Sequence, residues 1–91
     1  MKYARPILVD GHRRISDVLN TDDYEPKPGW WVSDEAALDK MFAPNKDAWV
    51  AAGEWFVQVP GGVQNGATYT GNDYMDPANY LNPDGTNGNG E

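Results

Sequence analysis

The residues best suited to chemistry in this chain are few. His12 is the one histidine, and Ser16 and Ser33 are the two serines. A nucleophilic site would need a carboxylate that orients Ser16 and His12 together, and nothing in the spacing favours that arrangement. Ser33 directly precedes Asp34 and Glu35, a pattern typical of a helix N-cap. We therefore predict no catalytic residues and expect a protein that is not an enzyme.

Acidic side chains supply two weaker candidates. Glu54 lies between Trp49 and Trp55, and an indole can raise the pKa of a neighbouring carboxyl group, as in some glycosidases. Oxygen donors also gather near the C-terminus, although not in the order of a calcium-binding EF-hand loop: Asp84, Thr86, Asn87 and Asn89. The favoured interpretation of both is a solvated acidic side chain or loop. We predict neither a metal nor a cofactor.

Aromatic residues are concentrated in the middle of the chain, and the simplest interpretation is that they build the core of a small domain. They are Trp30, Trp31, Phe42, Trp49, Trp55 and Phe56. Trp30 and Trp31 are adjacent, so their side chains would point to opposite faces of an extended segment. One of the two can then anchor a partner, because tryptophan is enriched among the residues that dominate binding energy.

Residues 61–91 differ in composition from the rest of the chain. They hold seven of the ten glycines. Their large apolar and aromatic side chains are Val63, Tyr69, Tyr74, Met75, Tyr80 and Leu81. Because such a composition buries little apolar surface, we predict an extended arm, with a reach of roughly 100 Å when fully stretched. The tyrosines recur every five or six residues and would supply contact area for a partner.

Residues 1–60 carry signals for two strands and a turn near the N-terminus. The apolar run 7–9 is followed by Asp10-Gly11, which predicts a hairpin turn with residues 12–14 as the returning strand. Aliphatic and basic side chains would then face each other, so one side of the hairpin must contact water. The apolar residues of 15–19 are spaced i, i+3, i+4, which predicts one or two helical turns.

Two short helices and a further strand are predicted later in the same part. A helix over 34–42 has Ser33 as its N-cap and apolar residues on one face. A second helix over 45–52 would end at Gly53. Residues 55–59 alternate in a pattern typical of a strand.

Size and charge exclude several classes of protein. The chain has 91 residues and a mass of 10.1 kDa, enough for one small domain. Its net charge is −7, and every lysine and arginine lies at or before Lys46, which argues against binding to nucleic acid or an anionic membrane. There are no cysteines for disulfides or thiolate metal sites. We find no signal peptide or membrane-spanning run, and expect a location in a virion or the host cytoplasm.

These patterns predict a small α+β domain with short helices and a hairpin or sheet over residues 1–60, followed by an extended irregular C-terminal arm over 61–91. The predicted function is a structural or interaction protein that docks through the arm on a repeated protein subunit of a larger assembly, such as a tailed-bacteriophage capsid or tail. Homo-oligomers are a further possibility. The candidate partner-binding residues are Trp30, Trp31, Tyr69, Tyr74, Met75, Tyr80 and Leu81.

Two alternatives remain open at this point. The acidic side chains would allow a small inhibitor that mimics DNA and binds a basic protein, and this predicts a regular array of carboxylates on one rigid face. An exposed tryptophan would instead allow a carbohydrate-binding module in which a sugar stacks on the indole ring.

Overall fold

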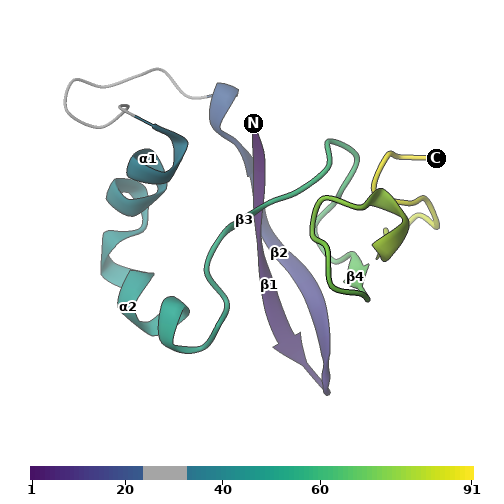
Figure 1. Cartoon of the computed structure of the whole chain (residues 1–91), viewed down its shortest axis with the longest axis horizontal. Helices are drawn as coiled ribbons and strands as arrows, with labels where there is room; N and C mark the ends of the chain where they lie inside the picture. Colours follow the sequence, from purple (N-terminus) through teal and green to yellow (C-terminus); the bar gives the residue numbers. More distant parts are fainter. Residues whose placement is uncertain (24–32) are drawn as a thin grey trace.

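The computed structural model describes residues 1–23 and 33–91, and within them one antiparallel sheet has the strand order β3-β1-β2-β4-β5 (Figure 1). The strands are β1 (Lys2–Val9), β2 (His12–Asn20), β3 (Val57–Gln58), β4 (Thr68–Tyr69) and β5 (Tyr80–Leu81). The helices are η1 (Thr21–Asp23), α1 (Asp34–Met41), α2 (Ala43–Ala51) and η2 (Pro77–Asn79). The predicted α+β class is therefore confirmed. No helix among the described residues is long and apolar enough to cross a membrane.

The long hairpin of β1 and β2 is the centre of the sheet. Its turn is the predicted Asp10-Gly11, where both residues have a positive φ, as a tight two-residue hairpin turn requires. Aliphatic and basic side chains face each other as expected, because Ile7 pairs with Arg14 and Leu8 pairs with Arg13. The predicted helical turns over 15–19 are wrong. Those residues continue β2, since cross-strand pairing with β1 outweighs a weak local preference.

A bulge interrupts the hairpin at Asp17. The pairing register shifts between Tyr3 and Arg5, and Asp17 has a φ of 53°. Its carboxylate Oδ2 lies 2.8 Å from Nη1 of Arg5. A bulge redirects the side chain that it carries, and here it places a carboxylate on a buried guanidinium.

Both predicted helices are present. The Ser33 side chain accepts a hydrogen bond from the backbone of Ala36, which confirms the N-cap of α1. α2 begins at Ala43, directly after α1, and has Pro44 in its first turn, where the missing N–H of proline leaves no helical hydrogen bond unmade. Gly53 follows α2 with a φ of 70°. The strand predicted over 55–59 is shorter than expected and forms β3.

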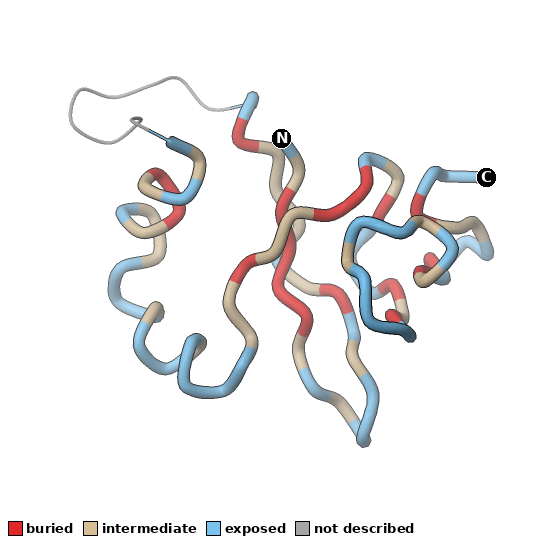
Figure 2. Tube along the Cα trace, viewed as in Figure 1, coloured by how far each residue is buried: buried red, intermediate tan, exposed pale blue. Residues whose placement is uncertain are grey.

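The sheet has a core on each face. Successive side chains of a strand point to opposite faces, so neighbours on β1 enter different cores. Tyr3 packs with Leu38 of α1 and with Phe56, whereas Ala4 packs with Ile15 in a cluster that includes residues from 59–80. Figure 1 accordingly shows the helices on one side of the hairpin and residues 61–91 on the other. Figure 2 shows buried positions in the hairpin and in the segment after β3, with an exposed hairpin tip.

The prediction of an extended C-terminal arm needs correction. Residues 61–91 are irregular for most of their length, but β4 pairs with β2 and β5 pairs with β4. Val63 and Ala67 are fully buried. The radius of gyration is 13.3 Å, close to the ~13 Å of a compact chain of this size and incompatible with a segment stretched away from the domain. Tertiary packing against Ile15 supplies the apolar contacts that the segment lacks by itself.

Candidate functional site

A pocket of about 660 Å³ lies at the end of the sheet where β1 begins and where β2 and β3 end. We call it the sheet-end pocket. Its lining comes from separate parts of the chain: residues 1–2, 18–20, 23, 58–61 and Met75. Strand pairing brings the start of β1 next to the ends of β2 and β3, because Lys2 lies opposite Asn20 and Tyr3 lies opposite Gln58.

Two methionines form part of the pocket wall and remain well exposed. Met1 is 52% exposed and Met75 is 48% exposed. The other apolar side chains of the wall are Val18, Leu19 and Val59. Methionine is flexible and polarisable, so it adapts to apolar groups of different shape. The pocket wall therefore combines polar groups with apolar side chains, of which the two methionines can adapt to an occupant.

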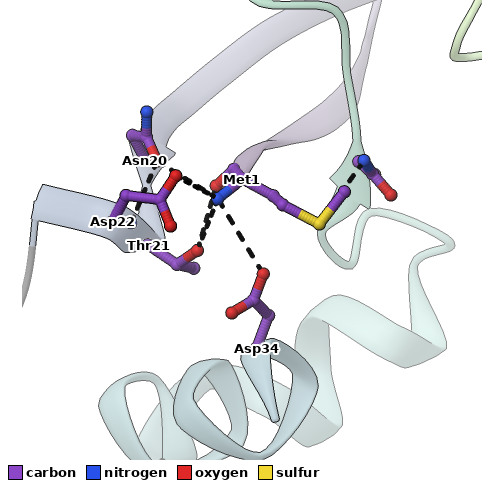
Figure 3. Close-up of polar contacts among 6 residues, drawn as sticks. Met1, Asn20, Thr21, Asp22 and Asp34 are labelled. Atoms are coloured by element: carbon purple, nitrogen blue, oxygen red, sulfur yellow. Dashed lines mark hydrogen bonds and ion pairs between the residues drawn. The ribbon is translucent and has the colours of Figure 1, made fainter. Parts of the chain in front are cut away.

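The amino group of Met1 is held by polar groups that lie on the opposite side of the residue from its side chain. It lies 2.9 Å from Oδ2 of Asp22, donates to Oγ1 of Thr21 at 2.9 Å, and lies 4.0 Å from Oδ2 of Asp34. Figure 3 shows these groups around the amino end while the Met1 side chain runs in the opposite direction. The thioether sulfur accepts a weak hydrogen bond from Nε2 of Gln58 at 3.8 Å. The backbone is thus anchored, and the side chain is left at the pocket.

Several polar groups in the pocket wall already have hydrogen-bond partners within the chain. Nζ of Lys2 donates to the carbonyl oxygen of Gly61 at 2.8 Å. Oδ1 of Asn20 accepts a hydrogen bond from the backbone of Asp22. Lys2 and Asp23 carry opposite charges in the same wall. This arrangement suits a neutral or apolar occupant with polar backbone groups better than a multiply charged small molecule.

The three predicted tyrosines are brought together, but in the core. Tyr69 is 4% exposed and Tyr80 is 3% exposed. The Tyr69 ring stacks on Tyr74 at a centroid distance of 4.4 Å and lies 5.1 Å from the Tyr80 ring. Oη of Tyr80 donates to the backbone oxygen of Tyr74 at 2.6 Å. Replacement of these tyrosines by alanine would therefore remove part of a core.

Of the other predicted partner-binding residues, the structure describes Met75 and Leu81. Met75 lines the sheet-end pocket. Leu81 is 59% exposed on β5, at the edge of the sheet. Trp30 and Trp31 lie outside the described residues. Among the described candidates, Met75 and Leu81 are therefore the accessible ones, the first at the pocket and the second at the edge of the sheet.

Glu54 has structural partners on both of its carboxylate oxygens. Oε2 accepts a hydrogen bond from the backbone N–H of Leu8 at 2.8 Å, and Oε1 lies 3.7 Å from Nη2 of Arg5. The Arg5 guanidinium stacks over the Trp49 ring at 3.5 Å and donates to the Glu54 carbonyl oxygen. Trp49 and Trp55 pack with Phe42 and Phe56, as the core interpretation of the aromatic residues predicts.

His12 and Ser16 do not form a pair. They are four residues apart on β2, which separates their backbones by about 13 Å. His12 is exposed near the hairpin turn, and the Ser16 hydroxyl donates to the neighbouring Asp17 carboxylate. No group of three or more His, Asp or Glu side chains in residues 1–23 and 33–91 is arranged to hold a metal ion.

Asp84 belongs to a turn held by its own hydrogen bonds. Its Oδ1 accepts from the backbone N–H and the hydroxyl of Thr86, and its Oδ2 accepts from Nε2 of Gln64 at 2.9 Å. These bonds lower the pKa of the Asp84 carboxyl group to about 2, those from Thr86 and Gln64 being the main cause. The carboxylate therefore stabilises a loop, which accounts for the clustered oxygen donors of this segment.

Several residues of the sheet-end pocket carry no signal in the sequence. Lys2 and Gln58 are ordinary strand residues and Met1 directly precedes β1, and only long-range pairing puts them beside Met75. The one available clue was that Met75 is a large apolar residue in a segment poor in such residues.

Comparison with known proteins adds no assignment: no protein-family model, curated protein or solved structure matches this chain.

Proposed function

We propose that this chain is a non-enzymatic interaction protein that docks on a protein subunit of a larger assembly through the sheet-end pocket. The observation that carries the proposal is the pocket itself, about 660 Å³ in volume, with the exposed side chains of Met1 and Met75 in its wall. Exposed apolar side chains that gather in a recess, here beside polar ones, mark a candidate contact site.

The occupant that fits the lining best is an extended segment of a partner protein with a protruding aliphatic side chain. Val18, Leu19 and Val59 supply apolar contacts for such a side chain, and the methionines adjust around it. Asn20 Oδ1 and Gln58 Nε2 already bond within the chain, so Nδ2 of Asn20 and Oε1 of Gln58 are the amide atoms that would bond the backbone of the segment. Since residues 47–91 contain six acids and no base, a neutral or basic partner surface is favoured.

Addition of a partner strand to the sheet is a less suitable mode of docking. The outer edge of β1 beyond β3 is blocked, because the Leu8 N–H is bonded to Glu54 and the Pro6 carbonyl oxygen accepts from Nη1 of Arg13. At the other edge, the backbone N–H of Asn82, next to β5, donates to the carbonyl oxygen of Thr86. Occupied edges of this kind oppose pairing with another chain, so recognition falls to side chains.

The proposal retains Met75 from the predicted contact residues and alters the role of the C-terminal segment. Tyr69 and Tyr80 are buried within the chain, so the segment is already packed on the domain before docking. The segment instead presents Met75 from a preformed surface, which lowers the entropic cost of binding. Repeated subunits, as in the capsid or tail of a tailed bacteriophage, are the setting that we propose for such docking.

The test is site-specific crosslinking in the organism that produces the protein. A photoreactive side chain at position 75 should crosslink to a component of a rapidly sedimenting assembly. The same side chain at position 50 is the control, because Val50 is 50% exposed on α2, away from the pocket. Crosslinks from both positions alike would contradict docking through the pocket.

A second variant fills the pocket without disturbing the core. Gly61 lines the pocket, and a Cβ atom built there meets no atom within 4 Å. We expect Gly61→Trp to lose most of the crosslinking from position 75, whereas Gly61→Ala keeps it. If the tryptophan variant sediments with the assembly as the parent chain does, the sheet-end pocket is not the docking site.

A further inference from the structure

Residues 61–91 contain three asparagines that are followed directly by glycine: Asn65-Gly66, Asn87-Gly88 and Asn89-Gly90. Such a pair can react without an enzyme, because glycine has no Cβ atom to hinder attack by its backbone nitrogen on the Cγ atom of the asparagine. The three pairs are alike in sequence, so their surroundings in the fold decide which of them reacts.

Water is the co-reactant of this deamidation. The glycine nitrogen forms a bond to Cγ of the asparagine, and the bond from Cγ to Nδ2 breaks. The side-chain nitrogen leaves as ammonia, which takes up the proton that the glycine nitrogen has lost. Water then opens the five-membered imide ring at one of its two carbonyl carbons. The product is aspartate, or isoaspartate with one more methylene group in the main chain, and both carry a new carboxylate.

Hydrogen bonds to β2 hold the first pair. Oδ1 of Asn65 accepts from the backbone N–H of Val18 at 3.0 Å, and the N–H of Gly66 donates to the Ile15 carbonyl oxygen at 2.8 Å. Both reacting groups are therefore bonded to a strand at the centre of the sheet. The pair can react only when these long-range bonds open.

A long-range bond also holds the second pair. The N–H of Gly88 donates to the Pro77 carbonyl oxygen at 2.9 Å, and Gly88 is buried. A Cβ atom at Gly88 would lie 2.8 Å from Cα of Pro77, so the two segments are in close contact. Oδ1 of Asn87 accepts from the backbone N–H of Asn89 at 2.9 Å. The attacking nitrogen and the side chain of this pair are thus both held.

The third pair differs because its hydrogen bonds are local. The N–H of Gly90 donates to the Asn87 carbonyl oxygen at 2.9 Å, within the same turn. Asn89 and Gly90 are both exposed. In the part of the chain that the structure describes, Asn89 bonds to this turn through its backbone N–H, which leaves its side-chain amide accessible. Opening of one exposed turn frees the Gly90 nitrogen at a lower cost than opening of the sheet.

We propose that Asn89 is a site of spontaneous deamidation, and that the fold protects Asn65 and Asn87 from the same reaction. The isoaspartyl product has a structural consequence. A Cβ atom at Gly62 would lie 2.3 Å from the Asn89 carbonyl carbon and from the Gly90 nitrogen, so this peptide bond packs directly on Gly62. A longer main chain at that point displaces residues 89–91. The inference does not rest on the proposed function.

The experiment is incubation of the purified full chain at mildly alkaline pH, both folded and in concentrated urea. Tandem mass spectrometry locates the residue at which the amide nitrogen has been replaced by oxygen. We expect the folded chain to react at Asn89 at least about tenfold faster than at Asn65 or Asn87, because those two need long-range bonds to open. The unfolded chain should react at all three at similar rates. A folded chain in which Asn89 stays intact, or in which either of the others reacts as fast, would overturn the proposal.

Asn89→Gln is the matched control for the site. It keeps a neutral amide, but its longer side chain would have to close a six-membered ring, which forms much more slowly. The variant should therefore gain no negative charge during the period in which the parent does, as anion-exchange chromatography measures. If the folded variant gains charge as fast as the folded parent, the reaction is not at Asn89.

Amide hydrogen exchange tests the structural consequence. The N–H of Gly62 donates to the Gly88 carbonyl oxygen at 2.9 Å and should exchange faster when residues 89–91 are displaced. The comparison is between the purified isoaspartyl form and Asn89→Asp, which has the same charge and a main chain of ordinary length. Faster exchange in the isoaspartyl form supports the displacement, and equal exchange in the two proteins would refute it.

Discussion

Tyr80 shows how one side chain joins the C-terminal segment to the rest of the fold. Its ring is 3% exposed and packs against Tyr69, and its hydroxyl donates to the Tyr74 backbone oxygen at 2.6 Å. Burial, with smaller effects from Tyr69 and Tyr74, raises the pKa of Tyr80 above the ordinary value of 10.0. The unfolded chain therefore loses this proton at a lower pH than the folded chain does.

We predict that Tyr80→Phe loses about 1 kcal/mol of stability at neutral pH, the usual net contribution of one hydrogen bond. The parent chain keeps the Tyr80 contribution below the ordinary pKa of 10.0 and loses it as the pH rises further. The difference in free energy of unfolding between the parent and Tyr80→Phe should thus become smaller in alkaline solution. Urea unfolding at neutral and alkaline pH measures this free-energy difference, with Tyr74→Phe as the control. A difference that does not change with pH would contradict the stabilising role of the Tyr80 hydroxyl.

Asp84 has the opposite dependence on pH. Its folded pKa of about 2 lies below the ordinary value of 3.8, so its contribution is present above pH 4 or so and is lost as the pH falls towards 2. We predict that Asp84→Asn is less stable than the parent at neutral pH, and that the stabilities of the two proteins become similar in acid. Urea midpoints from neutral pH down to the acid range test this. A difference that grows in acid would show that the carboxylate is not the stabilising form.

At the scale of elements, the close approach of two loops decides where the C-terminal segment lies. The N–H of Gly62 donates to the Gly88 carbonyl oxygen at 2.9 Å. A Cβ atom at Gly62 would lie 2.3 Å from backbone atoms of Asn89 and Gly90, closer than atoms can approach. Glycine is therefore required by the contact between the segments and not by a turn.

We predict that Gly62→Ala destabilises the protein by about 1–3 kcal/mol, as overpacking in a close contact usually does. Gly61→Ala is the matched control, because its Cβ meets nothing within 4 Å. Urea unfolding gives the two stabilities, and the backbone amide at position 62, which donates to Gly88 in the parent, should exchange its hydrogen faster in the Gly62→Ala variant. Equal stabilities would mean that residues 88–91 do not pack as the structure describes.

Sequence patterns predicted the elements that depend on neighbours in the chain. The Asp10-Gly11 turn, the Ser33 cap and Gly53 after α2 all follow from backbone conformations that nearby residues favour. The second half of β2 was missed, because its apolar spacing also fits a helix and the deciding bonds come from β1. β4 and β5 are two residues long and carry no local signal.

At the scale of the whole molecule, Arg5 connects the two strands of the hairpin to the helical layer. Its side chain is 9% exposed, pairs with Asp17 at 2.8 Å, bonds the Glu54 carbonyl oxygen and stacks on Trp49. Because both carboxylate partners keep some exposure to water, removal of the guanidinium leaves charges that are only partly desolvated.

We predict that Arg5→Ala lowers the free energy of unfolding by about 3 kcal/mol, the lower end for a broken buried ion pair. Lys46→Ala breaks the exposed pair with Asp39 and should cost at most about 1 kcal/mol. Urea unfolding of the two variants, with tryptophan fluorescence as the signal, compares them. If Arg5→Ala lowered the free energy of unfolding no more than Lys46→Ala, the contacts of Arg5 would not be what joins the hairpin to the helices.

The sequence by itself determined the α+β class, the hairpin turn, the two helices and the aromatic core beside them, because these depend on local conformational preferences and on large apolar side chains that must be buried. Only the tertiary structure decided the place of residues 61–91 and the position of the sheet-end pocket. A segment rich in glycine has too few apolar groups to order itself, so its conformation depends on contacts with Ile15 and the rest of the sheet. The same long-range pairing that buries Tyr69 and Tyr80 leaves Met75 at the pocket.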